Sequence, residues 1–118
     1  MSIVRRNDER KSFSKQFFDG TGELYMRQII NSVDELSGKG RLFNHVYIEP
    51  GDSLGWHVHK GDSELYYILK GDGEYSDNGN LIDVHTGDVT IVFDGEGHSI
   101  KNTGDDTLEM IALIVYTA

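Results

Sequence analysis

Short apolar runs separated by glycine-containing turns recur along the chain from about residue 23 onward. Several of these runs alternate apolar and polar residues, which is typical of half-buried β-strands. The runs are too short and too closely followed by turns to predict long helices. The pattern predicts nine strands, at residues 23–30, 41–49, 54–59, 64–69, 73–77, 81–85, 89–93, 98–102 and 107–116.

This spacing of strands and turns predicts an all-β fold, either a sandwich or a barrel. The clearest turn is at residues 77–80, because its Asn-Gly pair readily adopts the positive φ angles of a tight hairpin. A helix is an alternative only at residues 29–39, where INSVDEL carries a weak helix-start signal. We expect one domain at residues 23–118, preceded by a polar, turn-rich arm at residues 1–22.

Composition narrows the classes of function. The chain of 118 residues contains no cysteine, which excludes disulfides, thiolate metal sites and thiol nucleophiles. Its net charge of −9 argues against sequence-independent binding to nucleic acid or to an anionic membrane. No signal segment opens the chain, and the longest apolar run, near residues 110–116, is too short to span a bilayer. We therefore expect a soluble, cytoplasmic protein.

Charge is distributed unevenly along the chain. Residues 1–15 carry a cluster of basic side chains with only two acidic ones, Asp8 and Glu9, whereas the remainder is strongly acidic. This basic arm is either a solvated terminal segment or a segment that docks onto a neighbouring subunit.

The stretch at residues 51–71 carries the strongest chemical signal. His57 and His59 are two residues apart, so in an extended strand both imidazoles point to the same face. Residues 60–63 read as a tight turn that brings Glu64 back beside them on the next strand. Two nitrogen donors and one oxygen donor that converge from a hairpin predict a metal site.

A second glycine-bounded stretch, GDVTIVFDGEGHSIKN at residues 87–102, contains His98. Together the two stretches resemble the cupin superfamily. The first cupin motif, G-x5-H-x-H-x3-4-E-x6-G, and the second, G-x5-P-x-G-x2-H-x3-N, match at nine positions. These positions are Gly51, His57, His59, Glu64, Gly71, Gly87, Gly95, His98 and Asn102. The sequence departs from the second motif at Phe93, where the family usually has a proline that binds no metal.

The resemblance implies a single small jelly-roll-like β-barrel whose interior holds a metal ion through His57, His59, Glu64 and His98. Mixed nitrogen and oxygen ligands suit Mn, Fe, Ni, Co, Cu or Zn without selecting one. A six-coordinate ion would keep two positions open for water, dioxygen or a chelating small molecule. The resemblance also implies a homodimer, often formed in this family by exchange of N-terminal strands, for which the basic arm and residues 13–30 are the candidates.

The strand pattern also proposes walls for a pocket. Tyr66 shares the inward parity of Glu64 and is either a hydrogen-bond partner near the ligands or core filling. Ile100 shares the parity of His98 and is expected to be an apolar wall. In the strand at residues 41–49, apolar content does not separate the two faces, so whether His45 and Tyr47 line the pocket stays open.

The function that this sequence favours is a metal-dependent enzyme acting on a small molecule, foremost a dioxygenase-like oxidoreductase. Decarboxylase or isomerase chemistry at the same site is a variant of that hypothesis. No catalytic acid or base emerges beyond metal-bound water, because Glu74, Asp94 and Glu96 read as turn or surface residues. The alternative is a barrel that binds or senses a small molecule without turning it over. A metal-free structural barrel is disfavoured by the intact set of four ligands.

Overall fold

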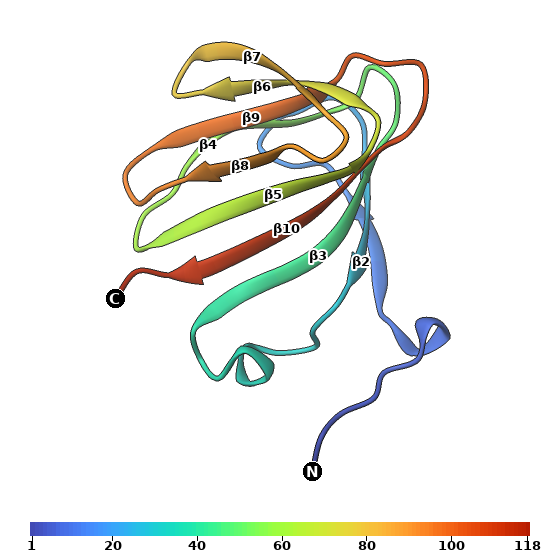
Figure 1. Cartoon of the computed structure of the whole chain (residues 1–118), viewed down its shortest axis with the longest axis vertical. Coiled ribbons are helices and arrows are strands. Elements are labelled where there is room, and N and C mark those ends of the chain that lie inside the picture. The colour runs from blue at the N-terminus through green and yellow to red at the C-terminus, as the bar shows by residue number, and fades with distance from the viewer.

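The computed structural model describes all of residues 1–118 as a two-sheet β-barrel with two short 3₁₀ helices (Figure 1). The 3₁₀ helices are η1 (Asn7–Glu9) and η2 (Val33–Leu36). The strands are β1 (Ser12–Lys15), β2 (Leu24–Gln28), β3 (Gly40–Ile48), β4 (Ser53–Val58), β5 (Asp62–Lys70), β6 (Asp72–Asp77), β7 (Asn80–His85), β8 (Val89–Val92), β9 (Gly97–Asn102) and β10 (Leu108–Tyr116).

The two sheets are antiparallel and differ in size. The larger sheet has the order β1-β2-β3-β10-β5-β8, and the smaller has the order β4-β9-β6-β7. β5 is followed by β6 in the opposite sheet, and β8 is followed by β9, so the chain crosses between the sheets repeatedly. This arrangement closes the two sheets around one interior, as Figure 1 shows.

The all-β prediction is confirmed, and each of the nine predicted strands is present with both ends within two residues of the predicted ones. The hairpin at residues 77–80 is also confirmed, since Asn78 and Gly79 have φ angles of 52° and 96°. The helical alternative at residues 29–39 is realised only as the single turn η2. One strand, β1, was not predicted.

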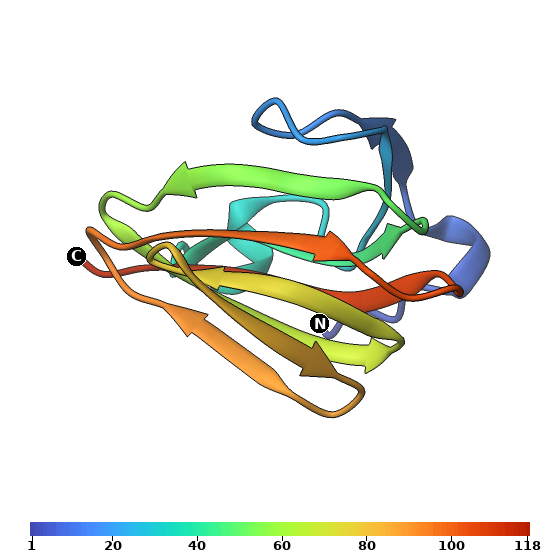
Figure 2. The ribbon, with the colours of Figure 1, turned by 90° about the horizontal axis from the view of Figure 1, so that it is seen from above.

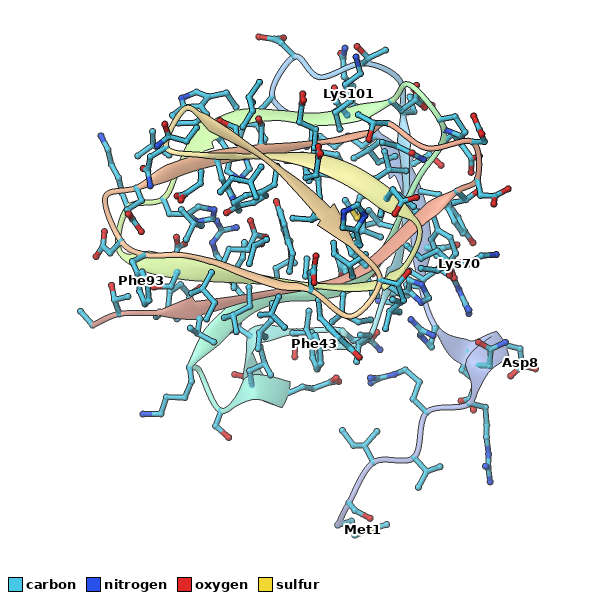
Figure 3. The ribbon with its side chains drawn as sticks, turned by 45° about the horizontal axis from the view of Figure 1, so that its top comes forward. Met1, Asp8, Phe43, Lys70, Phe93 and Lys101 are labelled. Carbon is cyan, nitrogen blue, oxygen red and sulfur yellow. The ribbon has the colours of Figure 1, made fainter.

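The core lies between the sheets, where side chains fill the interior (Figure 3). Alternate residues of β3, β5 and β10 are buried, and apolar side chains from β4, β6 and β9 meet them from the other sheet. Asn102 joins the layers at one end, because its buried side chain donates to the carbonyls of Ile48 and Asp106, at 2.8 Å each.

The N-terminal arm is held against its own chain. The Arg5 guanidinium forms a two-pronged ion pair with Glu35, at 2.9 and 2.7 Å. Arg10 donates to the backbone carbonyls of Gln28 and Arg27. The arm is therefore not simply a solvated tail. No helix in the structure has the length and apolar character needed to cross a membrane.

Candidate metal centre

Three strands and one strand end bring the four expected ligands together inside the barrel. His57 lies on β4, directly opposite His98 on β9, and His59 follows the end of β4. Glu64 lies on β5 in the facing sheet. All four residues are buried or at the border of burial, and their donor atoms lie within 4.8 Å of one another.

The donor atoms are spaced as metal ligands are. His98 Nε2 lies 3.0 Å from both His57 Nε2 and Glu64 Oε1, and 3.2 Å from His59 Nε2. Glu64 Oε1 lies 3.2 Å from His59 Nε2 and 3.5 Å from His57 Nε2. With metal–ligand bonds of about 2.1 Å, neighbouring ligands of one ion lie about 3 Å apart. The cluster therefore has a spacing that one transition-metal ion fits.

The imidazoles are also oriented correctly for a metal. Nδ1 of His57 donates to the Gly55 carbonyl at 2.9 Å, and Nδ1 of His59 donates to Asp62 Oδ1 at 2.7 Å. Nδ1 of His98 lies 2.8 Å from the Tyr75 hydroxyl. A neutral imidazole that carries its proton on Nδ1 has its lone pair on Nε2. The carbonyl and carboxylate acceptors therefore leave the Nε2 lone pairs of His57 and His59 facing the same point as His98 Nε2 and the Glu64 carboxylate, which is the donor set of a cation site.

The ionisable groups of the centre perturb one another. Burial alone would raise the pKa of the Glu64 carboxyl, but hydrogen bonds with His57, His59 and His98 outweigh it and hold that pKa well below its usual range. The hydrogen bond with Glu64 raises the pKa of His59 above its usual value, against the effect of burial. Burial lowers the pKa of His98. The Glu64 carboxylate therefore stays negatively charged, and it can pair either with a cation or with protonated imidazoles.

A cavity of about 230 Å³ opens beside these ligands. His57, His59 and Glu64 form one side of it, and most of the remaining wall is apolar, with Leu42 and Val46 from β3 and Ile114 from β10 among the lining residues. Two cationic side chains, Lys15 and Arg41, also line it. A mostly apolar cavity with candidate metal ligands and two cationic residues on its wall suits a small anionic ligand.

Arg41 connects this cavity to the ligand shell. Its Nε donates to Asp62 Oδ2 at 2.9 Å, while the other oxygen of Asp62 accepts from His59. The Asp62 side chain is only 7% exposed, whereas that of Arg41 is 46% exposed. Asp62 thus holds His59 in place from below the surface, and its ion pair with Arg41 joins His59 to a residue that lines the cavity.

The open question about β3 is settled against His45 and Tyr47 as pocket residues. Asn44, Val46 and Ile48 are buried toward the interior, so the alternate residues His45 and Tyr47 face outward. His45 Nε2 lies 2.9 Å from Glu109 Oε1, and the Tyr47 ring stacks on the His45 ring. Both faces of this strand carry apolar and polar residues, which is why the pattern alone could not separate them.

The other two expected wall residues, Tyr66 and Ile100, face inward, but neither is among the residues that line the cavity. Tyr66 is fully buried, its ring stacks on His98 with 4.8 Å between centroids, and its hydroxyl lies 3.4 Å from His98 Nε2. Ile100 is buried in the core. Sequence reasoning missed five residues that lie around the site. These are Lys15, Phe18, Arg41, Asp62 and Tyr75. Only Asp62, three residues after His59 in the tight turn, carried a local signal.

Comparison with known proteins agrees with this architecture. Residues 44–116 match a family model described as a cupin domain. An oxalate-binding protein of Thermotoga maritima is 43% identical over 113 residues, which are 96% of this chain and 93% of that protein.

Solved structures show the same similarity. A predicted oxalate decarboxylase from Thermotoga maritima superposes with a TM-score of 0.90 at 38% identity, covering 97% of this chain and 99% of that one. A putative sugar phosphate isomerase from Acidithiobacillus ferrooxidans shares the fold, with a TM-score of 0.78 at 22% identity over 95% of this chain and 74% of that one. The chain is a member of the cupin family, with a histidine and glutamate cluster that could bind a metal ion.

Proposed function

We propose that this protein binds oxalate, or a closely related small dicarboxylate, at a divalent transition metal held by His57, His59, Glu64 and His98. The observation that carries the proposal is a single cavity whose wall contains three of these ligands, His57, His59 and Glu64, together with Arg41 and Lys15. The similarity to an oxalate-binding protein over nearly the whole chain supports the same ligand class.

The charges of the site suit a dianion. A bound divalent metal would act as a Lewis acid that holds carboxylate oxygens at its open positions. Glu64 would neutralise one charge of the metal and Asp62 already pairs with Arg41, so Lys15 supplies the further positive charge that the two carboxylates of oxalate require. Arg41 suits a carboxylate ligand because its planar guanidinium donates two parallel hydrogen bonds to a carboxylate. The apolar wall excludes water and strengthens these interactions.

The residues of the cavity support binding of oxalate better than they support its decarboxylation. Decarboxylation of oxalate to carbon dioxide and formate requires a proton at the carbon left behind. The acidic side chain among the cavity-lining residues is Glu64, which is assigned to the metal and whose pKa is held low. A decarboxylase is the second candidate, because a structure 38% identical to this chain is described as a predicted oxalate decarboxylase. The dioxygenase-like activity favoured by the motifs alone has no such support.

Calorimetric titration of oxalate into manganese-loaded protein tests the proposal. We expect oxalate to bind the metal-loaded protein and not the metal-free protein or His98→Ala. Arg41→Ala should weaken binding at least about tenfold, because the two charge-assisted hydrogen bonds of the guanidinium to the carboxylate are lost. Lys70→Ala, which removes a cation from the exposed end of β5 (Figure 3), should bind as the wild type does.

Two results would decide between the alternatives. Oxalate that binds equally with and without metal would contradict the proposal. Release of one formate per oxalate consumed, measured by NMR and lost in His98→Ala, would show instead that the protein is a decarboxylase.

A further inference from the structure

The loop at residues 16–23, between β1 and β2, docks onto the strand that carries His57. The amide of Gly55 donates to the Phe17 carbonyl at 3.0 Å, and the amide of Ser53 donates to the Thr21 carbonyl at 3.0 Å. The Thr21 amide donates in return to Ser53 Oγ at 2.9 Å. Figure 2 shows the loop, in blue, running alongside β4, in light green. The loop is thus fastened to β4 along its length.

Two glycines allow this close approach. A Cβ atom at Gly55 would collide with the carbonyl oxygen of Phe18, and a Cβ at Gly20 would collide with the carbonyl oxygen of Ser53. Backbone therefore packs on backbone at both points, and a side chain on either glycine would push the loop away from β4.

The tip of the loop has an unusual backbone. Phe18 and Asp19 have φ angles of 53° and 59°, in the left-handed region that a bulky side chain such as phenylalanine rarely adopts. Such a conformation persists only where surrounding contacts hold it, and it clusters at ligand sites and clamps. Here the contacts of Phe17, Gly20 and Thr21 with β4 hold it.

This backbone places the Phe18 ring directly against a metal ligand. The ring stacks on the His57 imidazole with 4.1 Å between centroids and 12° between planes. Phe18 is nevertheless 58% exposed, so its other face meets solvent. It also lines the cavity. The ring therefore stands between bulk water and one face of His57.

We propose that Phe18 is a positioning residue of the metal centre and the outer wall of its cavity. The hydrogen bond to the Gly55 carbonyl prevents the His57 imidazole from rotating within its own plane, and the stacked Phe18 ring prevents that plane from tilting. Together they aim Nε2 at the metal and slow the escape of the ion to solvent. This inference rests on the metal centre proposed above.

The stacking is tested first in metal-free protein. Phe18→Gly removes the ring while leaving a residue for which the left-handed backbone carries no strain. We expect the imidazole proton signals of His57 to shift downfield in NMR spectra when the ring current of Phe18 is lost. The matched control is Phe13→Ala, which removes a partly exposed phenylalanine of β1 that lines a different groove. Unchanged His57 signals in Phe18→Gly would overturn the stacking.

The second readout is metal release. We expect cobalt-loaded Phe18→Gly to lose its metal to a chelator about tenfold faster than wild type or Phe13→Ala, with an altered visible cobalt spectrum. A wild-type release rate and spectrum in Phe18→Gly would overturn the positioning role. If Phe18→Gly does not fold, Phe18→Leu decides, because it keeps the bulk without the flat ring and must still release metal faster than Phe13→Ala. Wild-type protein that takes up no cobalt would instead refute the metal centre itself.

Discussion

Each imidazole of the metal centre is oriented through Nδ1 by a different kind of partner. His57 uses the backbone carbonyl of Gly55, His59 uses the carboxylate of Asp62, and His98 uses the hydroxyl of Tyr75. The carbonyl and the carboxylate can only accept, so they fix the tautomers of His57 and His59 and raise the basicity of Nε2, while the hydroxyl holds the orientation of the His98 ring. Three independent partners hold the imidazoles in place without an ion, which would lower the entropic cost of binding a metal.

The pKa of His59 makes metal binding depend on pH. Because Glu64 and Asp62 raise this pKa, protonated His59 stabilises the metal-free fold below about pH 6.5, the usual value for histidine. That stabilisation is lost as pH rises through the raised pKa. A metal ion replaces the proton, so its apparent affinity should rise by up to about tenfold per pH unit and then level off above the raised pKa.

Competition with a chromophoric chelator between pH 5.5 and 8.5 measures this profile. His85→Ala is the matched control. It also removes a histidine whose pKa is raised by a carboxylate, Asp72, but His85 is exposed and lies away from the site. That variant should show the wild-type profile. An affinity that does not change with pH in the wild type would contradict proton competition at His59.

For single residues, the sequence pattern predicted the four ligands but missed most of the side chains that contact them. The pair His57 and His59 is visible because alternate residues of a strand share a face. Arg41 and Tyr75 reach the site only through strand pairing, which single-sequence periodicity does not encode. His45 has the same chemistry as the ligands but faces Glu109 on the outer side of β3.

At the scale of elements, predicted and observed strands agree because turns punctuate this chain so regularly. The strand that was missed, β1, reads SFSK and is exposed along its whole length. It forms the edge of the larger sheet and pairs only with β2. Its strand conformation comes from that pairing rather than from a buried face, so no apolar alternation marks it in the sequence.

The contact between β4 and the loop at residues 16–23 depends on the absence of a side chain at Gly55. Gly55→Ala places a methyl group against the Phe18 carbonyl oxygen. We expect a loss of about 1–3 kcal/mol in the free energy of unfolding, the usual cost of overpacking. Urea denaturation of the metal-free protein measures it.

Gly104→Ala is the control for that measurement, since its new methyl group would meet only ordinary van der Waals contacts, from 3.5 Å outward. This substitution should be close to neutral. Equal stability of the two variants would show that the loop does not depend on close packing against β4.

For the whole molecule, the outer face of the larger sheet predicts a homodimer. Tyr67 on β5 and Val89 on β8 are paired neighbours, and Ile91 lies two residues further along β8. All three are exposed by about half, and such contiguous apolar surface is typical of protein interfaces. We expect light scattering after gel filtration to give about twice the chain mass of 13.3 kDa.

The double variant Tyr67→Asp with Ile91→Asp should be a monomer that still binds metal, since these side chains face away from the centre. Leu81→Asp, which places a charge on the exposed surface of β7 in the other sheet, should remain dimeric. A monomeric wild type would contradict this interface. A monomer produced instead by deletion of residues 1–22 would favour exchange of N-terminal strands.

Metal content is the most direct test of the central claim, that His57, His59, Glu64 and His98 hold one transition-metal ion. The measurement is elemental analysis of protein purified without chelator, for the wild type and for His98→Ala. We expect about one equivalent of a single transition metal per wild-type chain and a loss of most of it in His98→Ala. A wild type with less than about 0.1 equivalent, or a His98→Ala variant with the same content as the wild type, would contradict the metal centre.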